Sequence, residues 1–209
     1  MYMTIFSFWK RGYMSQYFTN ESLKSNIVKH KVKILNTSFC FNTDNGVFAK
    51  SKIDFGTVFL LETVSSLSLP SSSRVLDVGC GYGVIGIVFA KVFHSSVDMV
   101  DVNKRAIHLT KMNLKENKVS GNVFESDAYA HVEGKYDLIV TNPPIRAGKK
   151  VVYSILFGAF DHLEENGSLY FVVRKNHGAK SIIKDLEEKY DVQVLDKSHG
   201  FFVIQAKKR

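Results

Sequence analysis

From residue 74 onward, the sequence alternates between short apolar runs and longer helix-like stretches. The apolar runs are typical of buried β-strands and lie at 74–79, 97–102, 121–126, 136–142 and 168–174. The stretches between them predict α-helices over 84–93, 104–118, 150–163 and 179–189. This alternation is typical of a parallel sheet with helices on both faces. We therefore expect an α/β fold.

Two more strands are expected at the end of the chain, over 191–197 and 200–207, with no helix between them. Strands joined by so short a link pair antiparallel. The expected sheet is therefore Rossmann-like, seven-stranded and mostly parallel, with one antiparallel strand near an edge. In such sheets a ligand binds beyond the carboxyl ends of the strands. We expect the functional site just after residues 79, 101, 126 and 142.

The N-terminal part has a different character. Residues 31–42 read as two short strands, followed by a loop with a turn signal at Asn45-Gly46 and by a helix over 57–67 that ends before Pro70. We expect one domain over residues 31–209, in which 31–70 form a short cap, and a tail over 1–30. The apolar stretch within residues 1–13 precedes its basic residues, unlike a signal peptide, so we expect these residues to be disordered or not native.

The amino-acid composition of the chain excludes several classes of protein and favours others. The chain has 209 residues, with 28 Lys and Arg against 20 Asp and Glu, which gives a net charge of +8. A basic charge favours a polyanionic partner such as nucleic acid. The alternative is that the surface is only mildly basic and solvated. Only Cys40 and Cys80 are cysteines, so a disulfide framework and a zinc site are not expected. No apolar run is long enough for a membrane span. We expect a cytoplasmic protein without a metal or a membrane partner.

A glycine-rich loop, DVGCGYG (77–83), follows the strand at 74–79. Its glycines allow a tight turn and a close approach to a ligand. Residues 81–86 also match the dinucleotide pattern GxGxxG, which by itself is weak evidence. A carboxylate at Asp77 would repel a pyrophosphate but suits a ligand with an ammonium or sulfonium group. Asp101, at the end of the next strand, suits a ribose diol. S-adenosylmethionine carries all of these groups.

The tripeptide NPP (142–144) ends the strand at 136–142. Proline has no N–H group, so the carbonyl oxygens of this segment are left to accept hydrogen bonds. The side-chain oxygen of Asn142 is a second acceptor. Two acceptors that converge on one –NH2 group would hold both of its hydrogens and aim its nitrogen at an electrophilic methyl group. The alternative is that NPP only terminates the strand.

Three motifs resemble those of the class I S-adenosylmethionine-dependent methyltransferases: VLDVGCGYG (75–83), VDVN (100–103) and ESDAY (125–129). The resemblance implies the class I methyltransferase fold, S-adenosyl-L-methionine as cofactor and S-adenosyl-L-homocysteine as product. It implies that Asp127 accepts from the adenine amino group, whereas the residues alone also allow an N-cap for a helix over 128–131. The implied cofactor-binding residues are Asp77, Gly79, Cys80, Gly81, Gly83, Asp101, Val102, Asp127, Ala128 and Asn142.

The segments TNPPIRAGK (141–149) and DNGVFAKSKIDFGT (44–57) resemble a narrower group, the small-domain methyltransferases. That family includes the guanine-N2 methyltransferases of small-subunit ribosomal RNA (methyltransferase C) and short one-domain relatives, and the resemblance covers roughly residues 30–206. It implies methylation of an exocyclic amino group, most directly guanine N2 of 16S ribosomal RNA, with ribosomal RNA or the small subunit as partner. It also places Phe55 and Thr57 in the cofactor pocket and implies a catalytic role for Asn142, Pro143, Pro144 and Ile145.

Two features depart from the family. An aromatic residue that stacks on the target base follows NPP in the best-known members, and here the residue is Ile145. The larger members also have an N-terminal domain that aids RNA recognition, for which these residues show no counterpart. Four basic residues are expected near the mouth of the site, where they either grip RNA phosphates or are solvated loop charges: Arg146, Lys149, Arg174 and Lys175.

Several other functions remain open from the sequence. They are methylation of adenine N6 in DNA, methylation of glutamine N5 in a protein, S-adenosylmethionine binding by an RNA-associated protein without turnover, and an NAD-dependent reductase. A DNA enzyme usually has a target-recognition insert and a glutamine enzyme a helical N-terminal domain, and neither is visible. Asp77 and NPP argue against the reductase. The sequence does not determine the oligomeric state, for which we favour a monomer.

Overall fold

The computed structural model describes residues 23–67 and 73–209, so the predictions for residues 1–13 and for Pro70 lie outside the described residues. Seven strands form one sheet in the order β5-β4-β3-β6-β7-β9-β8. All neighbours are parallel except that β9 runs antiparallel to both β7 and β8. The predicted α/β sheet with one reversed strand beside an edge is therefore confirmed. The strands are β3 (Arg74–Val78), β4 (Ser96–Asp101), β5 (Asn122–Glu125), β6 (Tyr136–Thr141), β7 (Leu163–Arg174), β8 (Tyr190–Ser198) and β9 (Phe201–Lys208).

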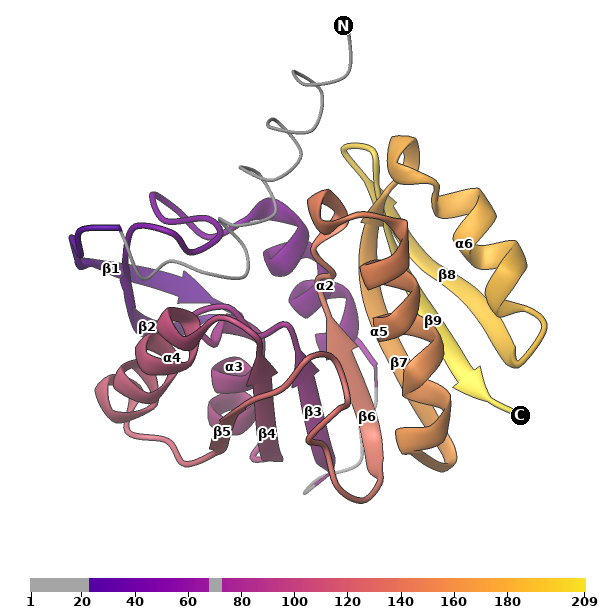
Figure 1. Cartoon of the computed structure of the whole chain (residues 1–209), viewed down its shortest axis with the longest axis horizontal. Helices are drawn as coiled ribbons and strands as arrows, with labels where there is room; N and C mark the ends of the chain where they lie inside the picture. Colours follow the sequence, from indigo (N-terminus) through magenta and orange to yellow (C-terminus); the bar gives the residue numbers. More distant parts are fainter. Residues whose placement is uncertain (1–22, 68–72) are drawn as a thin grey trace, which may run out of the picture.

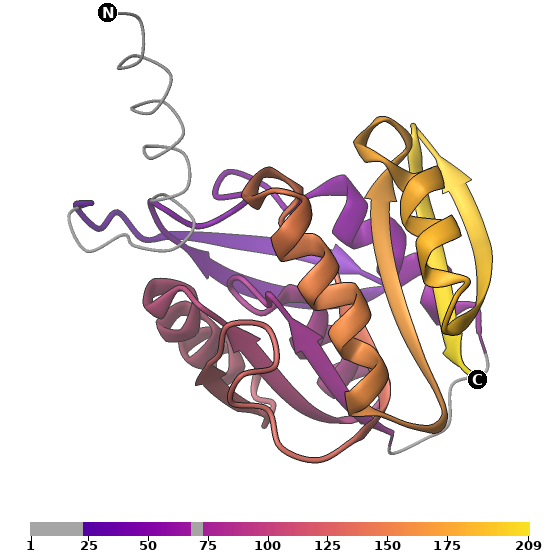
Figure 2. The ribbon, with the colours of Figure 1, turned by 45° about the vertical axis from the view of Figure 1, so that its right-hand side comes forward.

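Helices cover both faces of the sheet (Figures 1 and 2). One apolar core contains residues of α2 (Phe55–Ser65), α3 (Val84–Val92) and α4 (Lys104–Asn117), and the other contains residues of α5 (Lys149–His162) and α6 (Ala179–Leu186). Alternate residues of one strand enter different cores: Val75 belongs to the first, Leu76 and Val78 to the second. The strands are apolar throughout because both of their faces are buried.

The N-terminal strands β1 (Val28–Ile34) and β2 (Thr37–Thr43) form a separate antiparallel hairpin. It turns at Leu35 and Asn36, whose φ angles of 48° and 61° are those of a tight two-residue turn. The predicted pair of strands is confirmed, but the first strand begins at Val28, earlier than the predicted residue 31. Helix α2 also begins two residues before its predicted start at 57, because Asp54 caps it by accepting from the Thr57 N–H at 3.3 Å.

The boundary between α5 and β7 also differs from the prediction of a strand from residue 168. Strand β7 begins at Leu163, directly after α5, and its register with β6 shifts between the pairs Tyr136–Leu163 and Leu138–Ser168. The one-turn helices η1 (Ile145–Ala147) and η2 (Lys175–His177) follow β6 and β7. None of the helices in the described part of the chain has the length and apolarity that a membrane-crossing segment needs.

Two asparagines on one side of α4 attach the hairpin to the sheet domain. Asn113 is fully buried, and its Oδ1 accepts from the Asn42 backbone N–H at 2.7 Å while its Nδ2 donates to the carbonyls of Asn42 (3.0 Å) and Tyr82 (2.8 Å). One turn later, Asn117 makes the same pair of bonds with the backbone of Cys40. The two side chains act as an extra strand edge for β2, which explains buried amides on an otherwise apolar helix face.

Replacement of Asn113 should therefore destabilise the fold. Asn113→Ala leaves the buried N–H of Asn42 and the carbonyl of Tyr82 without their partners, and we expect the free energy of unfolding to fall by about 2–4 kcal/mol in urea titrations. His108→Ala, at an exposed position of the same helix, is the control and should change it by less than about 0.5 kcal/mol. A loss below about 1 kcal/mol for Asn113→Ala would contradict the role of this amide.

A second buried polar residue, Asp77, ties β3 to α3. Its side chain is fully buried, and Oδ2 accepts from the Gly86 N–H at 2.9 Å, whereas Oδ1 has no partner among the described residues. Burial raises the pKa of Asp77 to about 7, against the Gly86 hydrogen bond, which lowers it, and with a smaller contribution from the charge of Asp101.

This pKa predicts a pH-dependent stability. The unfolded chain releases the Asp77 proton near its ordinary pKa of about 3.9, and the folded protein releases it only near 7, so the contribution of Asp77 to stability is present at low pH and is lost as the pH rises between these values. We expect the free energy of unfolding, relative to Asp77→Asn, to fall by up to about 1.4 kcal/mol per pH unit and to level off above 7. Parallel pH profiles of the two proteins in urea titrations would contradict this.

Candidate active site

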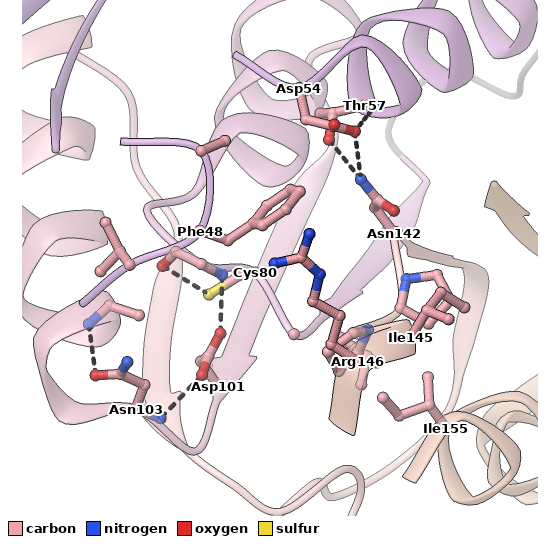
Figure 3. Close-up of a pocket in the computed structure, with 18 of the residues that line it drawn as sticks. Phe48, Asp54, Thr57, Cys80, Asp101, Asn103, Asn142, Ile145, Arg146 and Ile155 are labelled. Atoms are coloured by element: carbon pink, nitrogen blue, oxygen red, sulfur yellow. Dashed lines mark hydrogen bonds between the residues drawn. The ribbon is translucent and has the colours of Figure 1, made fainter. Parts of the chain in front are cut away.

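A pocket of about 1070 Å³ lies beyond the carboxyl ends of β3, β4, β5 and β6, where the sequence predicted the site (Figure 3). It opens where the strand order reverses between β3 and β6, the usual ligand position in such sheets. The following residues named from the sequence line it: Thr57, Gly79, Cys80, Gly81, Asp101, Val102, Asp127, Ala128, Asn142, Pro143, Pro144, Ile145, Arg146 and Arg174.

The glycine loop after β3 leaves space for a ligand. Gly79 and Gly81 have φ angles of 72° and 57°, and a Cβ on either would meet no protein atom within 4 Å. The N–H groups of Gly79 and Cys80 donate to the Val100 carbonyl at 2.9 and 3.0 Å, which holds the loop against β4. Gly83, in contrast, does not line the pocket, and a Cβ there would lie 2.7 Å from Cγ2 of Thr110. The geometry thus gives Gly83 a packing role at the start of α3 rather than the predicted ligand contact.

Asp101 stands at the end of β4 with both oxygens engaged by the backbone. Oδ2 accepts from the Gly81 N–H and Oδ1 from the Asn103 N–H, each at 2.9 Å. Burial raises the pKa of Asp101, and these N–H donors work against that rise. Because a carboxylate oxygen can accept more than one hydrogen bond, Asp101 retains acceptor capacity toward the pocket. This is the capacity that a ribose diol needs.

Asp127 follows β5 at the same edge of the sheet. Residues 128–131 form a turn, in which the Ala130 N–H donates to the Asp127 carbonyl at 3.0 Å and Ala128 has a φ of 47°. The alternative of an N-cap for a helix over 128–131 was therefore wrong. The Asp127 side chain makes no hydrogen bond with the described residues, so it is left as an acceptor at the pocket wall.

Asn142 is held by residues from the start of α2. Its Nδ2 donates to Oγ1 of Thr57 at 2.9 Å and to Oδ2 of Asp54 at 3.1 Å, and its oxygen points away from both (Figure 3). Within the described residues no donor reaches that oxygen. Beside it, the Pro144 carbonyl already accepts from the Ala147 N–H at 2.9 Å, whereas the Pro143 carbonyl has no partner in the part of the chain that the structure describes. The pocket wall here therefore presents two acceptors without a partner among the described residues, the Asn142 side-chain oxygen and the Pro143 carbonyl.

Besides Gly83, four residues predicted at the site do not line the pocket. Asp77 lies fully buried beneath the glycine loop, so it does not present its carboxylate directly to a ligand in the pocket. Phe55 starts α2 on its outer side, where its ring packs against Phe59, Phe201 and His199. Lys149 lies over the Tyr153 ring at 4.5 Å, and Lys175 belongs to the one-turn helix after β7.

Other lining residues were not predicted. In the sequence, the only sign of Asp54 is that it stands three residues before Thr57, where it can cap a helix. The only sign of the loop from Asn45 to Ala49 is its turn signal. This loop is fixed by α4, because Nδ2 of Asn103 donates to the Gly46 carbonyl at 3.2 Å. It carries Phe48, which is 53% exposed, and Figure 3 shows the Phe48 ring and the Arg146 guanidinium between Asp101 and Asn142. His177, which the sequence did not distinguish from an ordinary loop histidine, also lines the pocket.

The residues present fit S-adenosylmethionine. The glycine loop offers open space, Asp101 offers acceptors for a ribose, and Asp127 offers one for an adenine amino group. Burial raises the pKa of the Cys80 thiol well above its usual value, which keeps it neutral and unsuited to nucleophilic attack. The described residues contain no group of histidine, cysteine and acidic side chains that could hold a metal ion.

Comparisons with known proteins agree with this geometry. The family model described as methyltransferase small domain matches residues 38–205. The uncharacterized protein YbxB of Bacillus subtilis (strain 168) is 39% identical over 202 residues, which are 93% of this chain and 100% of that protein. Ribosomal RNA small subunit methyltransferase C of Haemophilus influenzae (strain PittEE) is 33% identical over 167 residues, or 78% of this chain. The chain matches only 49% of that relative's length.

Among solved structures, the 16S rRNA N2 guanine methyltransferase (RsmC) of T. thermophilus, in complex with AdoMet and guanosine, superposes with a TM-score of 0.78. It is 25% identical, and the match covers 90% of this chain and 52% of that one. The family match over most of the chain, together with a pocket that suits the cofactor, leads to one conclusion. This chain belongs to the methyltransferase small-domain family and is an S-adenosylmethionine-dependent methyltransferase with the class I fold.

Proposed function

We propose that this chain methylates the exocyclic N2 amino group of a guanine in 16S ribosomal RNA. The observation that carries the proposal is the acceptor wall at Asn142. Its amide oxygen and the Pro143 carbonyl are both without partners among the described residues, while the amide nitrogen is engaged by Asp54 and Thr57. A planar –NH2 group has two hydrogens to donate, and two adjacent acceptors suit it.

The chain's own residues would act by positioning. S-adenosylmethionine, when bound, supplies an electrophilic methyl group on a sulfonium. Asn142 and Pro143 would hold the two amine hydrogens and so direct the nitrogen lone pair at the methyl carbon. As the nitrogen–carbon bond forms, the methyl carbon's bond to sulfur breaks, S-adenosyl-L-homocysteine leaves, and the nitrogen would release one of its two hydrogens as a proton to solvent. Asp101 and Asp127 would set the depth of the cofactor in the pocket, since they lie at the ends of the neighbouring strands β4 and β5. No covalent intermediate with the protein is needed, in agreement with the neutral thiol of Cys80.

The choice of ribosomal RNA as substrate rests on the relatives and on charge. Methyltransferase C relatives are named for the small-subunit RNA, and the net charge of +8 favours a polyanion. Arg146 reaches into the pocket and makes no hydrogen bond or ion pair with the described residues (Figure 3). Arg174 lines the same pocket, with its guanidinium 4.4 Å from the centre of the Phe201 ring. A guanine in structured RNA would have to leave its stack to enter.

Ile145 supplies no aromatic face for a base, but the pocket contains one. Phe48 is exposed and faces the space beside Arg146 (Figure 3). We propose that it replaces the stacking residue that follows NPP elsewhere in the family.

The acceptor wall would equally hold the amine of adenine or the amide of glutamine, so these substrates are the alternatives that the experiment must separate. The small ribosomal subunit as partner, a cytoplasmic location and a monomeric state stay predictions.

The test is transfer of a labelled methyl group from S-adenosylmethionine. The acceptors are 30S subunits, naked 16S RNA, DNA and a release factor, each from a strain that lacks this protein. We expect label in 30S subunits or their RNA, mapped to guanine N2. Label on adenine N6 or on glutamine would contradict the guanine assignment. Absence of label in all four, with tight cofactor binding by calorimetry, would contradict the proposed substrate class.

Two substitutions should separate cofactor binding from catalysis. Asp101→Ala removes the acceptors for the ribose, so we expect the Kd of S-adenosylhomocysteine to rise about 10- to 100-fold. Asn142→Ala removes an amine-positioning acceptor, so kcat should fall about 100- to 1000-fold while that Kd stays within about 3-fold. Calorimetry and steady-state kinetics measure the two effects. If Asn142→Ala turned over within a few-fold of the original protein, the positioning role would be wrong.

A further inference from the structure

We propose that Asp54 and Thr57 are positioning residues that lock the amide of Asn142 with its oxygen toward the substrate amine. The effect on turnover rests on the proposed function, whereas the locked orientation is a property of the protein alone. Through Asn142, these two residues of the N-terminal segment would influence the methyl transfer without contacting the substrate amine themselves.

The geometry satisfies both hydrogens of one amide group. Nδ2 of Asn142 donates to Oγ1 of Thr57 at 2.9 Å and to Oδ2 of Asp54 at 3.1 Å. The same Oδ2 atom accepts from the Thr57 N–H at 3.3 Å, so the start of α2 holds Asp54 in place. The rotated amide would direct its oxygen at the Asp54 carboxylate, which can only accept, so it would lose that hydrogen bond and set two acceptors against each other, although the Thr57 hydroxyl could still donate to it. We expect this orientation to be disfavoured by more than about tenfold.

The orientation matters for the reaction. With the nitrogen engaged, Asn142 can offer the pocket only an acceptor, which suits the hydrogens of an incoming amine. In the rotated form it would offer a donor and repel them. The clamp therefore removes an unproductive state before the substrate binds, which is a form of preorganisation.

Both ends of the clamp are rigid. On one side, Leu60 and Leu61 of α2 are fully buried against the sheet. On the other, Thr141, the residue before Asn142, is fully buried, and its Oγ1 donates to the Val78 carbonyl at 2.7 Å. A Cβ at Gly56 would lie 2.9 Å from Oδ2 of Asp54 and 2.9 Å from Cε1 of Phe201. The absence of a side chain at position 56 thus makes room for the carboxylate.

The variants must separate the clamp from helix capping, because Asp54 also caps α2. Asp54→Ser keeps a capping residue but is too short to reach Asn142 in the same way. Thr57→Val removes the hydroxyl acceptor at nearly constant volume, and Thr57→Ser restores it. Glu62→Ala, at an exposed position of the same helix, is the matched control.

The first readout is a double-mutant cycle on methyl transfer. We expect Asp54→Ser and Thr57→Val each to lower kcat by at least about 10-fold with KM for S-adenosylmethionine within about 3-fold, and Thr57→Ser to recover at least about 10-fold over Thr57→Val. In the Asn142→Ala background, Asp54→Ser should lower kcat by less than about 3-fold. An equal loss in both backgrounds would overturn the proposal, because it would show that Asp54 acts independently of Asn142.

The second readout needs no turnover. The side-chain amide resonances of Asn142 in a ¹⁵N-labelled protein are assigned by their loss in Asn142→Ala, and their hydrogen-exchange rate reports the clamp. We expect exchange at least about 10-fold slower than for an exposed asparagine, and a return to the exposed rate in the Asp54→Ser, Thr57→Val double variant. Fast exchange in the original protein would overturn the clamp. Slow exchange with no methylation of any substrate would instead overturn the proposed function and leave the clamp standing.

Discussion

The hydrogen bonds of the Asn142 amide join two parts of the chain that the sheet topology alone does not connect. Asn142 directly follows β6, which lies in the middle of the sheet, and its partners Asp54 and Thr57 belong to the segment before β3. If this contact were absent, the acceptor wall of the pocket would lose its defined orientation.

Other side-chain amides also hold the N-terminal segment, through its backbone. Asn113 and Asn117 bind the backbone of β2, and Asn103 binds the Gly46 carbonyl in the following loop. Each of these contacts uses a side-chain amide that meets a backbone group. Amides can donate and accept together, so they match the mixed polarity of a strand edge or loop that apolar packing would leave unsatisfied. The segment over the pocket is thus held by polar contacts as well as by the apolar core under α2.

The chemistry of the pocket follows from which groups are already satisfied. The carboxylate of Asp101 accepts hydrogen bonds from the N–H groups of Gly81 and Asn103, so its position is set before a ligand binds. The carboxylate of Asp77 accepts from the Gly86 N–H through one oxygen, which ties β3 to α3 within the core, and it does not line the pocket. Two acids in neighbouring strands therefore have different tasks, which their spacing from the glycines did not reveal.

The local pattern of apolar and polar residues was sufficient to predict much of the fold. Each apolar run of the alternation became a strand because both faces of a parallel sheet are buried, and a ligand site at the strand ends follows from the topology. By itself the sequence determined the α/β fold with one reversed strand near an edge of the sheet. Only the tertiary structure decided that Asp54 contacts Asn142, that Phe55 faces outward and that Asp77 lies beneath the loop. The physical reason is that periodicity records which face of an element is buried, whereas the partner of a polar side chain depends on how elements far apart in the chain pack together.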